Sequence, residues 1–515
     1  MSKAKSMAKV STKGVFNIFW GLIASSIISA VGVMIVAGIL TESEYGLVAI
    51  ALTGPNLLAI FRDWGVDWAT IKYTAQYRSE NKEQNIRPVL ASIVLFEVLL
   101  GFSLSVISFF LSGFMAANIF ERPDLAPLIQ VASFVIFAEA LMKAAQATFT
   151  GYEKMEYHSI TSVVYSSLKT GFMILLAVLG FGSFGAIVGT TVAYVISGII
   201  AAILLYVVVY RNIPRQNGSL QLFSTTKTLL RYGLPLSVSA IVGGFLGQFY
   251  NVLLAIFCSD LLIGNYQVAI NFGSIVTFFV MPVLTVLLPA FSKIDSQKEQ
   301  KTLGSVFQFS VKYASLLIVP VAFAVIALAQ PTVSTFFGTK YSHTPLYLAL
   351  YVVVFIYTAF GYLSIENILK SQGRTDINMK LVLITSGISL ILNVILIPSF
   401  GILGLLVTNI FATIPTILVA LWWIQKKFKA TIDWNSSAIV VLATASASLI
   451  TYLAVSTLML PSLLTLILGL VLSSVTYLFP APMVGAITHA DVNNLKDMIN
   501  GLGPLAPLFS LPLSV

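Results

Sequence analysis

Long apolar runs recur along almost the whole chain and constrain its fold more than any other feature. A helix crosses a bilayer with about 20 apolar residues, and about fourteen segments have that length and character. The predicted spans are 14–40, 45–71, 89–112, 125–149, 157–180, 184–209, 229–258, 262–289, 303–329, 343–369, 377–398, 401–424, 437–458 and 461–480. With 57% hydrophobic and 10% charged residues, a chain of 515 residues cannot form a water-soluble globule. We therefore predict an all-α polytopic membrane protein.

Lysine and arginine residues are concentrated in alternate loops between these spans. The basic side carries the N-terminus and the loop residues Arg78, Lys82, Arg87, Lys154, Arg211, Arg215, Lys227, Lys293, Lys298, Lys301, Arg374, Lys380, Lys426, Lys427 and Lys429. The other side has little beyond Arg122 and Lys340. Because short cytoplasmic loops retain Lys and Arg, we predict a multi-pass protein of the cytoplasmic (inner) membrane with both termini in the cytoplasm. An even number of spans requires the same arrangement.

Short glycine-containing motifs occur twice in the same order, which indicates an internal duplication. Phe181-Gly182-Ser183-Phe184-Gly185 returns as Phe400-Gly401-Ile402-Leu403-Gly404, and Tyr45-Gly46 has a counterpart in Gly264-Asn265-Tyr266. Membrane transporters built from two repeats place a substrate site at the interface of the repeats and move one against the other. Since each predicted repeat has six spans, the repeats should be parallel and related by an axis along the membrane normal.

The duplication divides the chain into five predicted parts. Residues 1–210 form an N-lobe of six spans, 211–228 form a cytoplasmic linker, and 229–425 form a C-lobe of six spans. Residues 426–480 add two spans outside the duplication, and 481–515 form a cytoplasmic tail. The loops are too short to hold a soluble catalytic or binding domain. The function must therefore lie within the helical bundle.

The sharpest cluster of ionisable residues inside a predicted span consists of Arg62, Asp63 and Asp67. Charged groups at membrane depth are costly and by default indicate a functional site. Asp63 and Asp67 are four residues apart and share one face of a helix, where they repel each other unless a cation intervenes. Gly65 can interrupt that helix. We predict a polar patch that lines a substrate cavity; the alternative is an internal, ion-paired brace between helices.

Lys169 lies near the middle of the predicted fifth span, with no acidic residue within one turn. It is the best single candidate for meeting an anionic headgroup, because an ammonium group at that depth needs a partner or a wet cavity. The alternative is an ion pair with Glu97 or Glu139 from neighbouring helices.

Two glutamates precede a lysine by four residues, which is the favourable order for an ion pair on one helix. These pairs are Glu139 with Lys143 and Glu366 with Lys370, and we predict that each neutralises itself. Lys312, in the ninth span, is a further candidate for the substrate cavity, although it can also reach the cytoplasmic interface by snorkelling.

Uncharged polar side chains on the predicted seventh and eighth spans are suited to hydrogen bonding with sugar hydroxyls. We predict that Gln248, Asn251, Gln267 and Asn271 line the substrate cavity, with Lys72 as a further candidate. The alternative is that these groups bridge helices, as polar residues often do in membranes.

The inventory of reactive side chains argues against catalysis. His158, His343 and His489 are scattered, and the single Cys258 excludes internal disulfides and cysteine-rich metal sites. The chain has no arguable Ser-His-Asp arrangement and no glycine-rich loop ending in Gly-Lys-Ser/Thr. We expect neither an enzyme nor a protein that binds a metal, a cofactor or nucleic acid.

Several motifs in order along most of the chain carry a family resemblance. They are Thr41-Glu42-Ser43-Glu44-Tyr45-Gly46, Arg62-Asp63-Trp64-Gly65, Arg231-Tyr232-Gly233-Leu234-Pro235, Gly264-Asn265-Tyr266, Leu288-Pro289-Ala290-Phe291-Ser292 and Leu392-Asn393-Val394-Ile395-Leu396-Ile397-Pro398, with Gly401 and Gly404. Together they resemble the polysaccharide transporter family, the O-antigen type flippases of the multidrug/oligosaccharidyl-lipid/polysaccharide exporter superfamily. The resemblance implies a V-shaped bundle of two six-helix lobes that flips a polyprenyl-linked oligosaccharide to the outer leaflet. The family often carries an acid near the position of Asn251, where this chain has none.

The implied partners are a polyprenyl-linked glycan, membrane lipid and polysaccharide-assembly proteins. Three alternatives are a lipid II-type flippase, a multidrug antiporter of the same superfamily and a membrane glycosyltransferase. The antiporter would place a carboxylate in the first or seventh span, and neither span has one. The glycosyltransferase could use Glu42 and Glu44 as a metal-binding pair, but such enzymes generally need a larger outer domain than these short loops supply. A flippase accounts best for the motifs.

Overall fold

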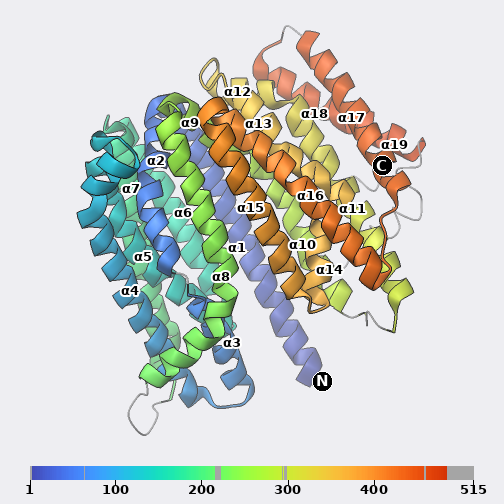
Figure 1. Ribbon diagram of the computed structural model, residues 1–515. Coiled ribbons are helices and arrows are strands. Elements are labelled where there is room, and N and C mark those ends of the chain that lie inside the picture. Colours follow the sequence, from blue (N-terminus) through green and yellow to red (C-terminus); the bar gives the residue numbers. More distant parts are fainter. Residues whose placement is uncertain are drawn as a thin grey trace. The chain divides into compact units, whose positions relative to one another are not determined.

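Every regular element in the described part of the chain is a helix (Figure 1). The computed structural model describes residues 3–62, 64–214, 222–292, 294, 298–457 and 460–483. The first half contains α1 (Lys3–Ile39), α2 (Glu42–Ala59), η1 (Ile60–Arg62), α3 (Val66–Ser79), η2 (Glu83–Asn85), α4 (Ile86–Phe114), η3 (Met115–Ile119), η4 (Pro123–Leu125), α5 (Ala126–Gly151), α6 (Met155–Val178), α7 (Gly182–Leu204), η5 (Leu205–Val209), η6 (Tyr210–Asn212) and α8 (Leu222–Phe257). The second half contains α9 (Asp260–Gly273), α10 (Ile275–Ser292), α11 (Gln300–Ala327), α12 (Ala329–Phe337), α13 (Thr344–Val352), η7 (Val353–Phe360), α14 (Tyr362–Ser371), α15 (Thr375–Phe400), α16 (Ile402–Phe428), α17 (Trp434–Thr457), α18 (Ser462–Leu478) and α19 (Pro480–Met483). The predicted tail lies outside the described residues after Met483.

Eleven of the described helical segments are long and apolar enough to cross a membrane. A twelfth span results if Thr344–Phe360 and Tyr362–Ser371, which are bent by 56° relative to each other, count as one. Each of the fourteen predicted spans overlaps at least one of the described helices. The eighth is divided between α9 and α10, and the fourteenth corresponds to α18, which has 17 residues. The prediction of an all-α multi-pass membrane protein is confirmed.

The chain forms two compact units. Unit 1 consists of Met1–Val268 with Ile397–Ile402, and unit 2 consists of Ala269–Leu396 with Leu403–Val515. The lobes and linker expected from the internal duplication have different boundaries, and that division stays a prediction.

Small and hydroxyl-bearing residues join the helices of unit 1. The Ser25 Oγ of α1 lies 2.6 Å from the Ser166 Oγ of α6, and Ser105 of α4 donates a 2.9 Å hydrogen bond to the Ser133 carbonyl oxygen of α5. Such contacts hold helices together where lipid supplies no hydrophobic drive between them. They give unit 1 a fixed frame around its buried charged residues.

The predicted second span is interrupted by Gly65. Thr41 begins α2 with a capping box, in which its side chain accepts from the Glu44 backbone N–H at 3.2 Å and the Glu44 carboxylate accepts from the Thr41 N–H at 2.8 Å. The helical segment ends at Arg62, and Gly65 adopts a φ of +69°, a left-handed conformation that glycine enters without strain, before α3 begins at Val66. The expected common helical face of Asp63 and Asp67 stays a prediction, because Asp63 lies outside the described residues; η1 ends at Arg62 and α3 begins at Val66.

Unit 2 is organised around α11, which packs against η7 and α17, while α18 packs on α17. Phe291 of α10, Phe307 of α11 and Ile424 of α16 are fully buried in one apolar cluster. The Tyr357 hydroxyl donates a 3.0 Å hydrogen bond to the Ile410 carbonyl oxygen in the same unit. Unit 2 therefore has its own core.

Candidate functional site

Arg62 forms the most deeply buried charged cluster of the described chain. Its Nε lies 3.6 Å from an oxygen of Glu97 on α4, and a terminal guanidinium nitrogen lies 3.6 Å from an oxygen of Glu139 on α5. The other terminal nitrogen donates a 3.3 Å hydrogen bond to the Ile136 carbonyl oxygen. The side chains of Arg62, Glu97 and Glu139 are 10%, 5% and 23% exposed, respectively. A charge at such depth is tolerated when it is paired, so this arrangement ties three helical segments together.

These contacts match the brace that the sequence left as an alternative for Arg62. They also occupy both acids that were expected as alternative partners of Lys169. Glu139 pairs with Arg62, while Lys143 is exposed, and the described contacts contain no ion pair between Glu139 and Lys143. That predicted local pair is wrong. A buried guanidinium close to Glu139 offers a stronger electrostatic partner than an exposed ammonium on the same helix.

The other charged candidates of unit 1 that the structure describes lie on α3 and α6. Lys169 is half-buried on α6 and forms no ion pair or hydrogen bond with any residue that the structure describes. Asp67 is half-buried in the first turn of α3, and Asp63 lies outside the described residues. Lys72 is exposed on α3, with its Nζ 3.8 Å from the centre of the Tyr232 ring on α8.

The uncharged candidates are all half-buried. On α8, the Asn251 side chain donates a 3.2 Å hydrogen bond to the Gln248 side chain, so these two are held together. Gln267 and Asn271 are one turn apart on α9; Gln267 belongs to unit 1, and Asn271 to unit 2. Lys312 is also half-buried, on α11 of unit 2. The predicted ion pair of Glu366 with Lys370 is confirmed on α14 of the same unit. A cavity formed jointly by all the candidates stays a prediction.

Two motifs that carry the family resemblance meet inside unit 1. The Gly65 backbone lies against that of Gly233 on α8, so closely that a Cβ atom added to Gly65 would stand 2.2 Å from the Gly233 carbonyl oxygen. Only glycine permits this approach of the two backbones. The nearby contact of Lys72 with Tyr232 joins the same elements, α3 and α8. The break after Arg62 is thus fixed by a specific helix contact.

A second backbone contact in unit 1 joins the first turns of α2 and α9. A Cβ atom added to Gly46 would stand 2.0 Å from the Asp260 carbonyl oxygen, and one added to Gly264 would stand 2.0 Å from that of Glu42. The Asn265 side chain donates a 2.6 Å hydrogen bond to the Glu42 carboxylate. The sequence offered a signal for this contact, because Tyr45-Gly46 and Gly264-Asn265-Tyr266 are repeated marks, but it did not show that they touch.

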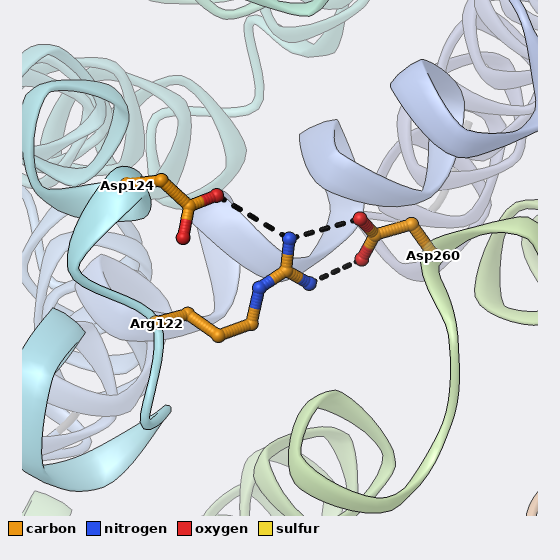
Figure 2. A network of polar contacts seen from close by, with 3 residues as sticks. All are labelled: Arg122, Asp124 and Asp260. Atoms are coloured by element: carbon orange, nitrogen blue, oxygen red, sulfur yellow. Dashed lines mark hydrogen bonds and ion pairs between the residues drawn. The ribbon is translucent and has the colours of Figure 1, made fainter.

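Arg122 completes this second contact (Figure 2). Its guanidinium faces the Asp260 carboxylate with two parallel hydrogen bonds, one of them 2.9 Å long, and lies 3.4 Å from Asp124. The hydrogen bonds that Arg122 donates to the Asp260 carboxylate raise the pKa of Arg122 above its ordinary value. Bidentate pairs of this kind fix geometry as well as charge. We call the set Glu42, Gly46, Arg122, Asp260, Gly264 and Asn265 the α2–α9 contact.

The helices and buried charges define a multi-pass membrane protein, and its fold is that of known transporters. The structure of lipid II flippase MurJ in an inward closed conformation matches with a TM-score of 0.72, at 17% identity, over 92% of this chain and 99% of that chain. An inward-facing multidrug resistance MATE family transporter of the MOP superfamily matches with a TM-score of 0.63, at 16% identity, over 79% of this chain and 94% of that one.

The chain belongs to the polysaccharide biosynthesis protein family, whose model matches residues 35–346. The model of the lipid II flippase MurJ family matches residues 242–479. Among relatives, the uncharacterized membrane protein MJ1068 of Methanocaldococcus jannaschii is 23% identical over 80% of this chain and 84% of its own length. The lipopolysaccharide biosynthesis protein WzxC of Escherichia coli is 24% identical over 70% of each chain. The probable low-salt glycan biosynthesis flippase Agl15 of Haloferax volcanii is 27% identical over 35% of this chain and 38% of its own length. The resemblance seen in the sequence motifs is confirmed.

Proposed function

We propose that this protein moves a lipid-linked oligosaccharide from the cytoplasmic to the outer leaflet of the cytoplasmic membrane by alternating access. The observation that carries this proposal is its membership of the polysaccharide biosynthesis protein family across residues 35–346. The names of Agl15 as a glycan biosynthesis flippase and of ExoT as a succinoglycan biosynthesis transport protein support the class of substrate. The protein transports its substrate without forming or breaking a covalent bond. Polysaccharide-assembly proteins are the partners that would receive the translocated oligosaccharide.

The proposed membrane arrangement follows the loop charges. Both termini face the cytoplasm, because the basic loops alternate with loops that contain little beyond Arg122 and Lys340. Two six-span lobes, 1–210 and 229–425, are joined by the linker 211–228 and move against each other as parallel repeats. The two final spans lie outside this duplication. In this orientation the α2–α9 contact faces outward, and it must open to release substrate on that side.

The candidate residues divide into three roles. Lys169 meets the anionic headgroup, because it is half-buried and its expected acidic partners are already paired with Arg62. The uncharged polar side chains contact the sugar hydroxyls; they are Gln248, Asn251, Gln267 and Asn271. The basic residues Lys72 and Lys312 are weaker candidates for the same cavity. Arg62 shapes the cavity wall through its brace, and the acids Asp63 and Asp67 extend the polar patch beyond it.

Paired substitutions of two lysines test the headgroup role. Lys169→Ala should impair export of a lipid-linked glycan more than Lys143→Ala, because Lys143 is exposed on the surface of unit 1 whereas Lys169 is half-buried within a predicted span. The assay is complementation of a strain that lacks its own flippase, normalised to the amount of protein in the membrane. Equal activity of the two variants would return Lys169 to a structural role.

A lipid II flippase is the second candidate function. The MurJ family model matches residues 242–479, and the MurJ structure covers 92% of the chain. The two functions separate in one experiment, in which the protein is expressed in cells depleted of their lipid II flippase. The polysaccharide proposal predicts no rescue of growth there, whereas full rescue would favour lipid II as the substrate.

A further inference from the structure

An apolar groove opens on unit 1, and none of its lining residues is among those predicted for the substrate cavity. It has a volume of about 480 Å³ and lies among α4, α5, the end of α7, η5, η6 and the start of α8. Five of its lining residues, Leu90, Ala91, Val94, Leu95 and Val98, fall on one face of α4. The opposite wall includes Ala202 and the π-helical turn η5, whose irregular backbone is unusual and often accompanies a functional site. The volume is that of a ligand pocket. We call this feature the α4 groove.

The length of the α4 groove matches one leaflet of a membrane. Arg87 stands at the beginning of α4, and Val98 is the last α4 residue that lines the groove. At 1.5 Å per residue, these two positions are about 16 Å apart along the helix. Half of the hydrocarbon core is about 15 Å thick. The groove therefore fits the acyl chain of a phospholipid in one leaflet, whereas a long polyprenyl chain would extend beyond it.

One end of the α4 groove carries a cation and aromatic rings. The guanidinium carbon of Arg87 lies 4.7 Å from the centre of the Tyr210 ring, and Tyr210 lines the groove. The Tyr206 ring stacks on Tyr210 at 6.1 Å, and Phe223, beside the lining residue Leu222, is 86% exposed. Aromatic residues with a basic residue are typical of the level of the lipid headgroups.

We propose that the α4 groove binds an anionic phospholipid of the cytoplasmic leaflet, with an acyl chain against Val94 and a phosphate at Arg87. The choice of leaflet follows from the proposed orientation, which places Arg87 in a cytoplasmic loop. A lipid held here packs on α4 and α5, the helices that carry Glu97 and Glu139. Its occupancy stabilises unit 1 independently of the transported glycan.

The test measures lipid binding to the full-length protein in a neutral detergent, by native mass spectrometry and by thermal unfolding. The probe is dioleoyl phosphatidylglycerol, with dioleoyl phosphatidylcholine as the uncharged comparison. Arg87→Gln should weaken phosphatidylglycerol binding about fivefold, the factor expected for one basic residue at a lipid surface, and leave phosphatidylcholine unaffected. Val94→Trp and, from the opposite wall, Ala202→Leu should remove the stabilisation by phosphatidylglycerol, because each fills the groove.

Two matched controls accompany these variants. Arg374→Gln removes a guanidinium that lies over Trp423 at the same 4.7 Å, and Leu99→Trp enlarges an exposed position of α4 that does not line the groove. Both should bind phosphatidylglycerol as the unmodified protein does. Unchanged binding in Arg87→Gln, or retained binding in both groove-filling variants, would overturn the proposal. Displacement of phosphatidylglycerol by an equal concentration of a polyprenyl phosphate would overturn it too, because the groove would then belong to the carrier lipid.

Discussion

Replacing Arg62 by glutamine should be among the most destabilising single changes in unit 1. The substitution removes the guanidinium that lies 3.6 Å from both Glu97 and Glu139, in a site where the side chains of Arg62 and Glu97 are only 10% and 5% exposed. Breaking a buried ion pair by removing one partner costs about 3–5 kcal/mol. We expect a loss of that size in the free energy of unfolding.

The assay is reversible chemical unfolding of the purified protein in detergent, followed by tryptophan fluorescence. The matched control is Arg374→Gln, because Arg374 forms an exposed pair with Asp376 at 3.0 Å, with side chains 37% and 52% exposed. Exposed pairs contribute about 0–1 kcal/mol. Adding Glu97→Gln to Arg62→Gln should recover part of the lost free energy of unfolding, because it removes the charge of one of the two carboxylates that pair with Arg62. A loss for Arg62→Gln no larger than that of Arg374→Gln would refute the brace.

Two further predictions concern ionisable groups that lie next to the ends of the described membrane-spanning helices, Cys258 after α8 and Asp433 before α17. Burial raises the pKa of the Cys258 thiol to about 11 from 9.0. Loosening the α2–α9 contact by Arg122→Gln should therefore raise the rate at which a membrane-impermeant maleimide labels Cys258, up to about 100-fold, whereas Asp124→Asn should leave that rate unchanged. Equal labelling rates in the two variants would contradict this prediction. Asp433 precedes α17, and the hydrogen bonds that it accepts from Ser436 lower its pKa. The first turn of α17 should therefore be fully protected from hydrogen exchange above the ordinary Asp pKa, and it should lose protection as the pH falls through the lowered pKa. Asp433→Asn should show no such loss, because asparagine caps a helix without titrating, and an identical pH profile would count against the cap.

The spans were predictable because bilayer thickness imposes a length that a sequence reveals directly. Their interruptions were harder to foresee. Glycine in the second span indicates a possible break, and the φ of +69° at Gly65 confirms that the helix is interrupted there. Hydropathy does not predict the division of the eighth span at Ser274, since residues 262–289 are long and apolar enough overall to form one span. Hydropathy reports burial in lipid, and it does not report where a backbone turns.

The charged contacts were less accessible to sequence reasoning than the helices. Spacing on one helix predicted a partner for Glu139 in Lys143, whereas the structure pairs Glu139 with Arg62, far away in the chain. The α2–α9 contact likewise joins residues that are far apart in the chain, because Arg122 and Asp260 come together only after the helices pack. Local rules describe neighbours on a helix surface. Partners in a low-dielectric interior are selected by packing, which one sequence does not reveal.

The most direct measurement of the proposed function is the distribution of the cell's own lipid-linked oligosaccharide between the two leaflets. It can be quantified by a membrane-impermeant reagent that modifies the sugar, applied to intact cells and to inverted vesicles, with and without the gene for this protein. The account predicts that loss of the protein traps the lipid-linked oligosaccharide in the cytoplasmic leaflet and that re-expression restores it to the outer leaflet. An unchanged distribution in cells that lack the protein, with no other flippase of the family present, would contradict the account.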